Sequence, residues 1–167
     1  MKRKLGLTAA LVVALAISGY AQKKPDFSGA WAPDQAATDA ANASTTTAAP
    51  PAGGGGGGGG RGGGGAMTIK QTGDSLAIER PGRGGGAPTT ITYKLDGSEQ
   101  EVPMGQATAK VKAKWDGDKI VMETTRAGQD GTPTTTTATY SIDKDGVLWV
   151  ETKAAMGTTK RAFKKST

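Results

Sequence analysis

The side chains in this sequence that could do chemistry are mainly carboxylates and lysines, because its 167 residues include no histidine and no cysteine. That composition removes the usual general base, the commonest metal ligand, thiol chemistry and disulfide bonds. An enzyme would then need paired carboxylates or an activated serine, lysine or tyrosine. Glu79, Glu123 and Glu151 fall in strand-like segments, and none of them belongs to a recognisable carboxylate pair. The sequence therefore predicts a non-enzymatic protein with no catalytic residue, metal or cofactor.

Four aspartates lie close to glycine in two short segments that could hold Ca²⁺. Asp116 and Asp118 belong to D-G-D, and Asp143 and Asp145 belong to D-K-D-G. Clustered carboxylates are typical of calcium sites, but the ligand spacing of an EF-hand and its terminal glutamate are absent. Aspartate before glycine is also typical of tight turns. We favour turns, with a calcium site as the alternative.

Lys110, Lys112 and Lys114 recur at every second residue and would form a basic stripe on one face of a strand. Such a stripe could bind an anion or a membrane surface, or it could be a solvated face that discourages edge aggregation. We favour the solvated face. The formal charge of the chain is +6, and loss of the three basic residues at 2–4 would leave about +3. This mild and dispersed charge predicts no nucleic-acid partner.

The stretch 106–119 positions these lysines. Its other face carries apolar side chains, namely Ala107, Ala109, Val111, Ala113 and Trp115. An unbroken period of two residues is typical of a half-buried β-strand. The strand ends at Asp116-Gly117, a strong signal for a hairpin turn. This stretch therefore predicts a strand with its alanines and valine in a core and its lysines in solvent.

The chain from residue 66 onward repeats this alternation between turns rich in glycine, aspartate and proline. We predict strands at 28–32, 67–71, 75–80, 89–95, 106–115, 119–126, 134–142, 147–154 and 158–165. Pro33 is expected to end the first strand, and residues 96–105 are expected to form a long turn. The fold class is then all-β, an antiparallel up-and-down meander of about eight to nine strands. Closure into a barrel would remove the exposed edges of such a meander.

Residues 1–21 are typical of a secretory signal peptide. Lys2-Arg3-Lys4 gives the positive start, residues 5–17 form a short apolar run, and Gly19-Tyr20-Ala21 offers a cleavage site. Cleavage after Ala21 would place the mature protein in the periplasm or outside a bacterial cell. The apolar run is short for a membrane span, so we expect no span in the mature protein. An uncleaved N-terminal anchor is the alternative.

The mature chain divides where its composition changes. Residues 22–33 are an N-terminal segment with the first strand, residues 34–65 are a loop, and residues 66–167 complete the barrel. The loop is rich in alanine, threonine and glycine, and its glycine tract predicts disorder because glycine loses the most backbone entropy on folding. Only residues 34–43 could form a turn or two of helix. The tract matches G-x-G-x-x-G, but without the strand and helix that a dinucleotide site requires.

The segment FSGAW, residues 27–31, resembles the opening of the lipocalin-like (calycin) barrels, whose first strand carries G-x-W. Together with the later A-K-W-D-G-D, it is also similar to uncharacterised secreted bacterial proteins of this architecture. The resemblance implies that Gly29 and Trp31 close the barrel floor. It also implies that a basic residue of the last strand lies over the tryptophan, and Arg161 is the candidate.

The interior of the barrel is the predicted ligand site. A barrel of about eight strands has room for its own side chains or for one small ligand. The residues predicted to contact a ligand are Ile69, Ile78, Tyr93, Val111, Met122 and Tyr140. The small alanines of 106–115 and the few aromatic residues leave space that would suit an apolar molecule. We therefore predict a secreted protein that binds a small apolar molecule. The alternative is a ligand-free structural or surface-interaction module of the bacterial envelope, and the sequence predicts no oligomeric state.

Overall fold

The computed structural model describes residues 24–43, 65–82, 85–104, 107–128 and 131–166. The predicted signal peptide, residues 1–21, lies outside these residues, and so does most of the predicted disordered loop, residues 44–64. Both stay predictions. Among the described residues, no helix is long and apolar enough to cross a membrane.

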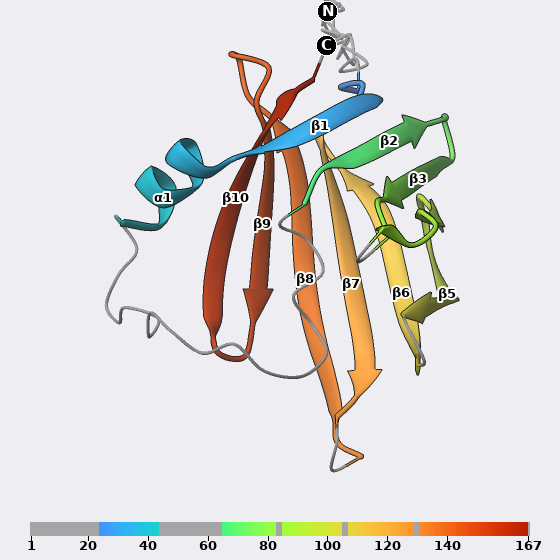
Figure 1. Ribbon diagram of the computed structural model, residues 1–167. Coiled ribbons are helices and arrows are strands. Elements are labelled where there is room, and N and C mark those ends of the chain that lie inside the picture. Colours follow the sequence, from blue (N-terminus) through green and yellow to red (C-terminus); the bar gives the residue numbers. More distant parts are fainter. Residues whose placement is uncertain (1–23, 44–64, 83–84, 105–106, 129–130, 167) are drawn as a thin grey trace, which may run out of the picture.

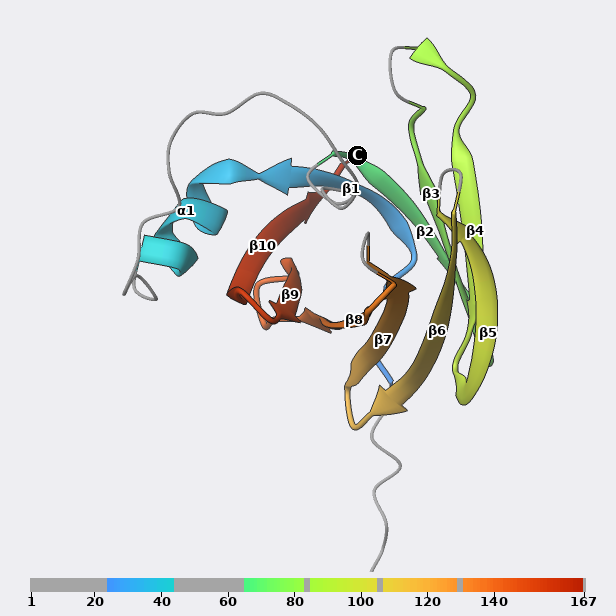
Figure 2. The same ribbon diagram turned by 90° about the horizontal axis from the view of Figure 1, so that it is seen from below.

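Ten antiparallel strands and one helix make up the described chain. They are β1 (Gly29–Asp34), α1 (Gln35–Ala43), β2 (Met67–Gln71), β3 (Ser75–Arg80), β4 (Thr89–Lys94), β5 (Asp96–Met104), β6 (Ala107–Asp116), β7 (Lys119–Ala127), β8 (Pro133–Ile142), β9 (Leu148–Ala154) and β10 (Gly157–Lys165). The strands form one sheet in the order β4-β3-β2-β1-β10-β9-β8-β7-β6-β5. This sheet curls into a nearly closed barrel with β4 and β5 at its two ends (Figures 1 and 2). The predicted all-β barrel is confirmed, with one strand more than expected.

Strand β6 has the alternation that the sequence predicted. Ala109, Val111 and Ala113 are buried, whereas the lysines between them are exposed, and Ala107 at the start of the strand is exposed as well. The turn into β7 places Gly117 at φ +63, a left-handed conformation that glycine adopts without steric cost. The two-residue period therefore sets both the register of this hairpin and the face that it turns to the core.

Strand β5 occupies the segment that the sequence predicted to be a long turn. Its residues pair with β6 from Met104 back to Glu99, and the register shifts between Glu99 and Asp96. The turn signal at Asp96-Gly97 therefore belongs to a bulge inside a strand pairing rather than to a loop. Pro103 is tolerated because β5 is the end strand of the sheet. Val102 is the buried side chain that packs this strand against the core.

Strand β1 runs past Pro33, which the sequence predicted to end it. β1 pairs with β10 as far as Asp34, but it pairs with β2 only as far as Trp31. Pro33 therefore lies where β1 has a strand on one side only, which is where a missing N–H is tolerated. Asp34 then starts α1, because its Oδ1 accepts the backbone N–H of Ala37 at 3.2 Å and so caps the helix.

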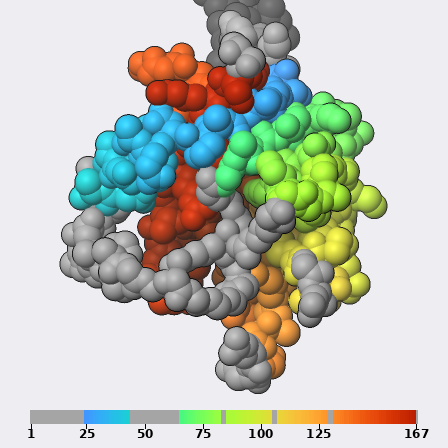
Figure 3. Space-filling view, viewed as in Figure 1, coloured from blue at the N-terminus to red at the C-terminus, as the bar shows by residue number. Residues whose placement is uncertain are grey.

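Helix α1 packs beside β10 beyond the point where β1 ends. Thr38 Oγ1 accepts the backbone N–H of Ala162 on β10 at 3.0 Å. Asn42 accepts the N–H of Lys160 at 3.0 Å and donates to its carbonyl oxygen at 2.8 Å. The helix thus satisfies backbone groups that a neighbouring strand would otherwise bond, and it lies fixed against the flank of β10 (Figures 1 and 3). Residues 35–43 of the predicted 34–65 loop are therefore an ordered helix.

The inward side chains form one contiguous core. The fully buried members with the largest volumes are Trp31, Phe27, Phe163, Ile69, Leu76, Ile120, Leu148 and Val111. Burial of each such large apolar side chain stabilises the fold by about 1.5–3 kcal/mol. They come from the segment before β1 and from seven strands, so the core holds all parts of the sheet together.

Candidate functional site: the barrel interior

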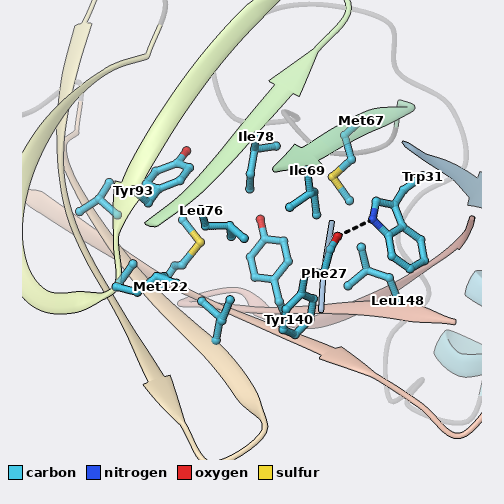
Figure 4. Close-up of a cluster of buried hydrophobic side chains, with 14 of the residues drawn as sticks. Phe27, Trp31, Met67, Ile69, Leu76, Ile78, Tyr93, Met122, Tyr140 and Leu148 are labelled. Atoms are coloured by element: carbon cyan, nitrogen blue, oxygen red, sulfur yellow. Dashed lines mark hydrogen bonds between the residues drawn. The ribbon is translucent and has the colours of Figure 1, made fainter. Parts of the chain in front are cut away.

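All six residues predicted to contact a ligand lie together inside the barrel. They are Ile69, Ile78, Tyr93, Val111, Met122 and Tyr140, and each exposes 5% of its surface or less. Figure 4 shows side chains from β2, β3 and β4 facing those of β7 and β8 across the interior. The structure accounts for all six as packing residues of the core. Their contact with a ligand stays a prediction.

Trp31 closes one end of the interior. Its indole Nε1 donates a hydrogen bond of 2.9 Å to the carbonyl oxygen of Phe27, and both side chains are buried (Figure 4). The basic residue over the indole is Lys165, whose Nζ lies 5.5 Å from the ring centroid. Arg161, the residue that the resemblance indicated for this place, lies earlier on β10, opposite Val150. The register of β10 on β1 explains the difference, because it puts Lys165 directly opposite Trp31.

Gly29 makes room for Lys165 at this end. Its φ is +140, and a Cβ at this position would lie 2.6 Å from Cε of the lysine. A side chain here would meet both an unfavourable backbone conformation and the stem of Lys165. The G-x-W motif therefore builds a slot in which the lysine stem crosses Gly29 and the ammonium group lies over Trp31.

Residues 25–27, which we call the N-terminal plug, seal the same end. The N–H of Phe27 donates to Gln71 Oε1 at 2.9 Å, and Gln71 Nε2 donates to the carbonyl oxygen of Pro25 at 3.2 Å. The Phe27 ring lies 5.9 Å from the ring of Trp115, and Lys24 Nζ lies 4.8 Å from the Trp115 ring centroid. Sequence reasoning assigned Phe27 only to the motif. The polar Gln71 at an inward position was the signal that a backbone segment would pass there.

Arg80 brings a charge into the interior, and the sequence analysis did not single it out. The register of β3 places Arg80 on the inward face, next in line after Ile78. Its guanidinium group lies near the hydroxyl of Tyr140, where it acts to lower the pKa of that hydroxyl. Burial raises the pKa of Tyr93 to about 12, the nearby Tyr140 adds to this rise, and Arg80 opposes it. Burial also raises the pKa of Tyr140, again opposed by Arg80. Both phenols therefore stay protonated at neutral pH and can donate a hydrogen bond.

Two interior side chains have a buried donor with no hydrogen-bond partner among the described residues. One is Arg80 Nε, and the other is Nε2 of Gln100, which faces inward from β5 opposite Val111. The indole Nε1 of Trp115 is unpaired in the same way. Each such donor costs about 1–3 kcal/mol while it stays unpaired. Native proteins keep unpaired buried donors mainly where water, an ion or a functional partner completes them.

The inward face of the barrel also carries polar side chains that are not fully buried. By register, inward positions of β7 to β10 include Thr124, Arg126, Thr136, Thr152 and Arg161. These side chains are half-buried, whereas Phe27 and Trp31 are buried. The same register turns every aspartate and glutamate of the described strands outward. The interior therefore combines fully buried apolar side chains with half-buried inward positions that carry hydroxyl groups and two arginines.

Two hollows open on the surface of the barrel. One, of about 370 Å³, lies over β1 to β3 and is lined by Met67, Glu79 and Pro81 among others. The second, of about 580 Å³, lies on the outer face of β7 to β9 beside α1. None of the six predicted ligand residues lines either hollow.

The lysine stripe of β6 faces outward and is partly neutralised. Lys110 Nζ lies 2.9 Å and Lys112 Nζ 3.5 Å from the carboxylate oxygens of Glu99 on β5. The hydrogen bond from Lys110 is the main cause that lowers the pKa of Glu99. This arrangement fits the solvated face that the sequence analysis favoured.

Asp143 organises the turn between β8 and β9. Its Oδ1 accepts the backbone N–H groups of Asp145 at 3.0 Å and Val147 at 2.9 Å, and its Oδ2 accepts the indole N–H of Trp149 at 2.9 Å. Within the described parts of the chain, no group of three or more potential ligands could hold a metal ion. Turn chemistry therefore accounts for this aspartate.

The contact between Asp143 and Trp149 should weaken in acid. The hydrogen bond from Trp149 is the main cause that lowers the pKa of Asp143, followed by the N–H of Val147. A carboxyl group with a lowered folded-state pKa stabilises the fold above its unfolded-state pKa, and this contribution is lost as pH falls through the folded-state pKa. The fluorescence of Trp149 should therefore change as pH falls below about 4. Asp143→Asn should abolish this change, with Trp149→Phe giving the background from the other tryptophans. A titration that is the same in Asp143→Asn would contradict the assignment.

Comparison with known proteins identifies the fold. No protein-family model matches the chain, and no curated protein matches its sequence. Among solved structures, a secretory abundant heat soluble protein from Ramazzottius varieornatus is similar, with a TM-score of 0.56 and 17% identity over 87% of this chain and 98% of that one. A structure named REP1-NXSQ fatty acid transporter gives a TM-score of 0.54 and 19% identity over 85% of this chain and 97% of that one. Lipid binding protein 8 from Caenorhabditis elegans gives 0.50 and 12% over 60% and 70%. The predicted resemblance to lipocalin-like calycin barrels is thereby confirmed for the fold.

Proposed function

We propose that this lipocalin-like barrel binds a small amphipathic molecule with an apolar body and an anionic head. The apolar body would lie against the inward side chains of the barrel, and the head would meet Arg80. The observation that carries the proposal is the buried, unpaired Nε of Arg80 in an interior to which the described strands contribute no carboxylate. The ligand is thus more specific than the wholly apolar molecule that the sequence predicted.

The charge balance of the interior favours an acidic head group. The Nε of Arg80 is buried without a hydrogen-bond partner, and a charged group that loses hydration without gaining an ion pair is costly. The titratable groups on which Arg80 acts are the neutral phenols of Tyr93 and Tyr140. Arg126 and Arg161 lie at inward positions by register and add further positive charge. A carboxylate or a similar acid would neutralise this positive charge and accept a hydrogen bond from the unpaired Nε of Arg80.

The comparisons support the class of ligand. One of the similar structures is named a fatty acid transporter, and another is named a lipid binding protein. A fatty acid has the apolar body and the single carboxylate that this interior would take. Secretion, which rests on residues 1–21, is part of the proposal and would make the protein a carrier outside the cytoplasm.

A ligand-free module is the second candidate, and one observation favours it. All six residues predicted to contact a ligand are buried against one another in the core. A barrel whose interior is filled by its own side chains would have to act through its surface.

Binding of oleic acid and of oleyl alcohol separates these candidates. The mature protein, stripped of lipid, should bind oleic acid, measured as displacement of a fluorescent fatty acid. Arg80→Gln should weaken oleic acid binding about tenfold or more, since a hydrogen bond to a charged group contributes about 1.5–3 kcal/mol. Binding of the alcohol should change much less, because the alcohol has no charge for Arg80 to meet.

Lys153→Gln is the matched control, because it removes one positive charge from the exposed outer face of β9. It should leave both affinities unchanged. Failure of the unmodified protein to bind either lipid would favour the ligand-free module. Equal losses for acid and alcohol in Arg80→Gln would contradict a head group at Arg80. Native mass spectrometry of protein purified from its own source would then give the mass of any natural ligand.

A further inference from the structure

The outer hollow beside α1, which we call the flank groove, is formed apart from the barrel interior. It has a volume of about 580 Å³, and its floor includes Val121, Thr139, Ser141 and Trp149. The strand register makes these residues neighbours, because Thr139 pairs with Val121 and Ser141 pairs with Trp149. All four alternate with inward core residues, so they lie on the face of the sheet turned away from the interior.

Trp149 is an unusual residue for this outer face. It is half-buried rather than buried, and it belongs to the floor of a groove instead of the core. Its indole N–H is already bonded to Asp143 Oδ2 at 2.9 Å, and that carboxylate is held in turn by Asp145 and Val147. The ring is therefore fixed before any ligand arrives, and its apolar surface is available for a flat partner.

Helix α1 supplies a rigid wall. Ala41 lines the flank groove, and the next residue, Asn42, bonds both backbone groups of Lys160 on β10. Thr38 adds a bond to the N–H of Ala162. The floor and wall are therefore held together by backbone contacts, so that the groove is preformed.

The charges of the flank groove balance. Its lining includes two acids, Asp116 and Glu151, and two bases, Lys119 and Lys160. Glu151 and Lys160 form an ion pair of 3.0 Å and stay about half exposed. Equal numbers of acids and bases give no net field that would select a nucleotide, an acidic lipid or a cationic peptide. They do provide acceptors and donors side by side, together with the hydroxyl groups of Thr139 and Ser141.

We infer that the flank groove is a carbohydrate-binding site, in which a neutral sugar ring lies on Trp149. A pyranose ring has an apolar C–H face that matches an indole ring and a rim of hydroxyl groups that donate and accept hydrogen bonds. The volume suits a short oligosaccharide, since it lies within the range typical of small-molecule sites, about 300–1,000 Å³. This site is independent of the lipid-binding proposal, because it uses the opposite face of the strands.

Nuclear magnetic resonance titration of the mature protein with maltotetraose, cellotetraose and tetra-N-acetylchitotetraose tests the inference. At least one of these sugars should shift the indole N–H resonance of Trp149 and the backbone resonances of Thr139 and Ser141. Trp149→Ala should weaken binding at least tenfold. Thr139→Arg should do the same by filling the groove from an outward position, which leaves the core untouched.

Thr137→Arg is the matched control, because Thr137 lies on the same face of β8, pairs with Glu123 and Lys153, and does not line the groove. It should bind the sugar as well as the unmodified protein does. If none of the three sugars shifts the groove resonances, or if Thr139→Arg and Thr137→Arg behave alike, the inference is wrong. Oleic acid binding should be equal in all these variants, so a failure here is distinct from a failure of the lipid-binding proposal.

Discussion

Replacing Trp31 by alanine should lower the free energy of unfolding by about 3–5 kcal/mol, as for other buried large-to-alanine changes. The side chain is 1% exposed, and it packs between Met67 on β2 and Lys165 on β10. Its loss would leave a cavity at the closed end of the barrel and would also leave the carbonyl oxygen of Phe27 without its donor. Denaturation in urea followed by circular dichroism measures the change, with the slope of the unfolding curve unchanged.

Two variants give this experiment its control. Trp31→Phe keeps an aromatic ring in the core but loses the hydrogen bond and some buried volume, so it should cost less than Trp31→Ala, about 1–3 kcal/mol. Trp149→Ala removes the same side chain from the outer face and should cost less than Trp31→Ala, because it loses the hydrogen bond to Asp143 but leaves no core cavity. A loss below about 1 kcal/mol for Trp31→Ala would show that the closed end does not depend on this residue.

The strand pattern could be predicted from the sequence wherever alternation was uninterrupted. In β6, every second residue from Ala109 to Ala113 is buried, and the period alone identifies that face. All six predicted interior residues are likewise buried, because each lies at an inward position of a strongly alternating strand. Local periodicity contains this information, so no tertiary knowledge was needed.

The predicted and observed elements differ where a tertiary contact overrides a local sequence signal. Pro103 and Asp96-Gly97 are typical of turns, but β5 lies at an end of the sheet and includes a bulge, so it accommodates both. The base over Trp31 could not be assigned from sequence either. Arg161 and Lys165 lie on the same face of β10, and only the register against β1 places Lys165 opposite Trp31.

The polar part of the candidate site was beyond sequence reasoning for a different reason. Arg80 ends a strand that is followed by proline and glycine, where a charged residue is expected to reach solvent. Only the curvature of the sheet brings it to Tyr140 on β8, which lies far along the chain. The sequence did contain a partial signal for an inward Arg80. It lies two and four residues after Ile78 and Leu76, which are both buried, and so shares their face of the strand.

Replacing Phe27 by alanine should also lower the free energy of unfolding by about 3–5 kcal/mol, although this residue precedes the first strand. Segments outside strands are usually dispensable, but Phe27 is fully buried and packs against Trp115. Its backbone N–H bonds Gln71, and its carbonyl oxygen accepts the indole N–H of Trp31. Loss of the ring would open a cavity beneath both tryptophans and loosen the N-terminal plug.

Conservative and surface variants decide whether this loss comes from the plug. Phe27→Leu should cost less than about 1.5 kcal/mol, because it keeps an apolar side chain of similar volume. Met156→Ala should change nothing, since Met156 is 101% exposed at the turn between β9 and β10. Hydrogen exchange should localise the effect, with faster exchange of the Phe27 and Gln71 amides in Phe27→Ala than in Phe27→Leu. Equal stability of Phe27→Ala and the unmodified protein would mean that residues 25–27 do not seal the barrel, and the closed end would then rest on Trp31 and Lys165 alone.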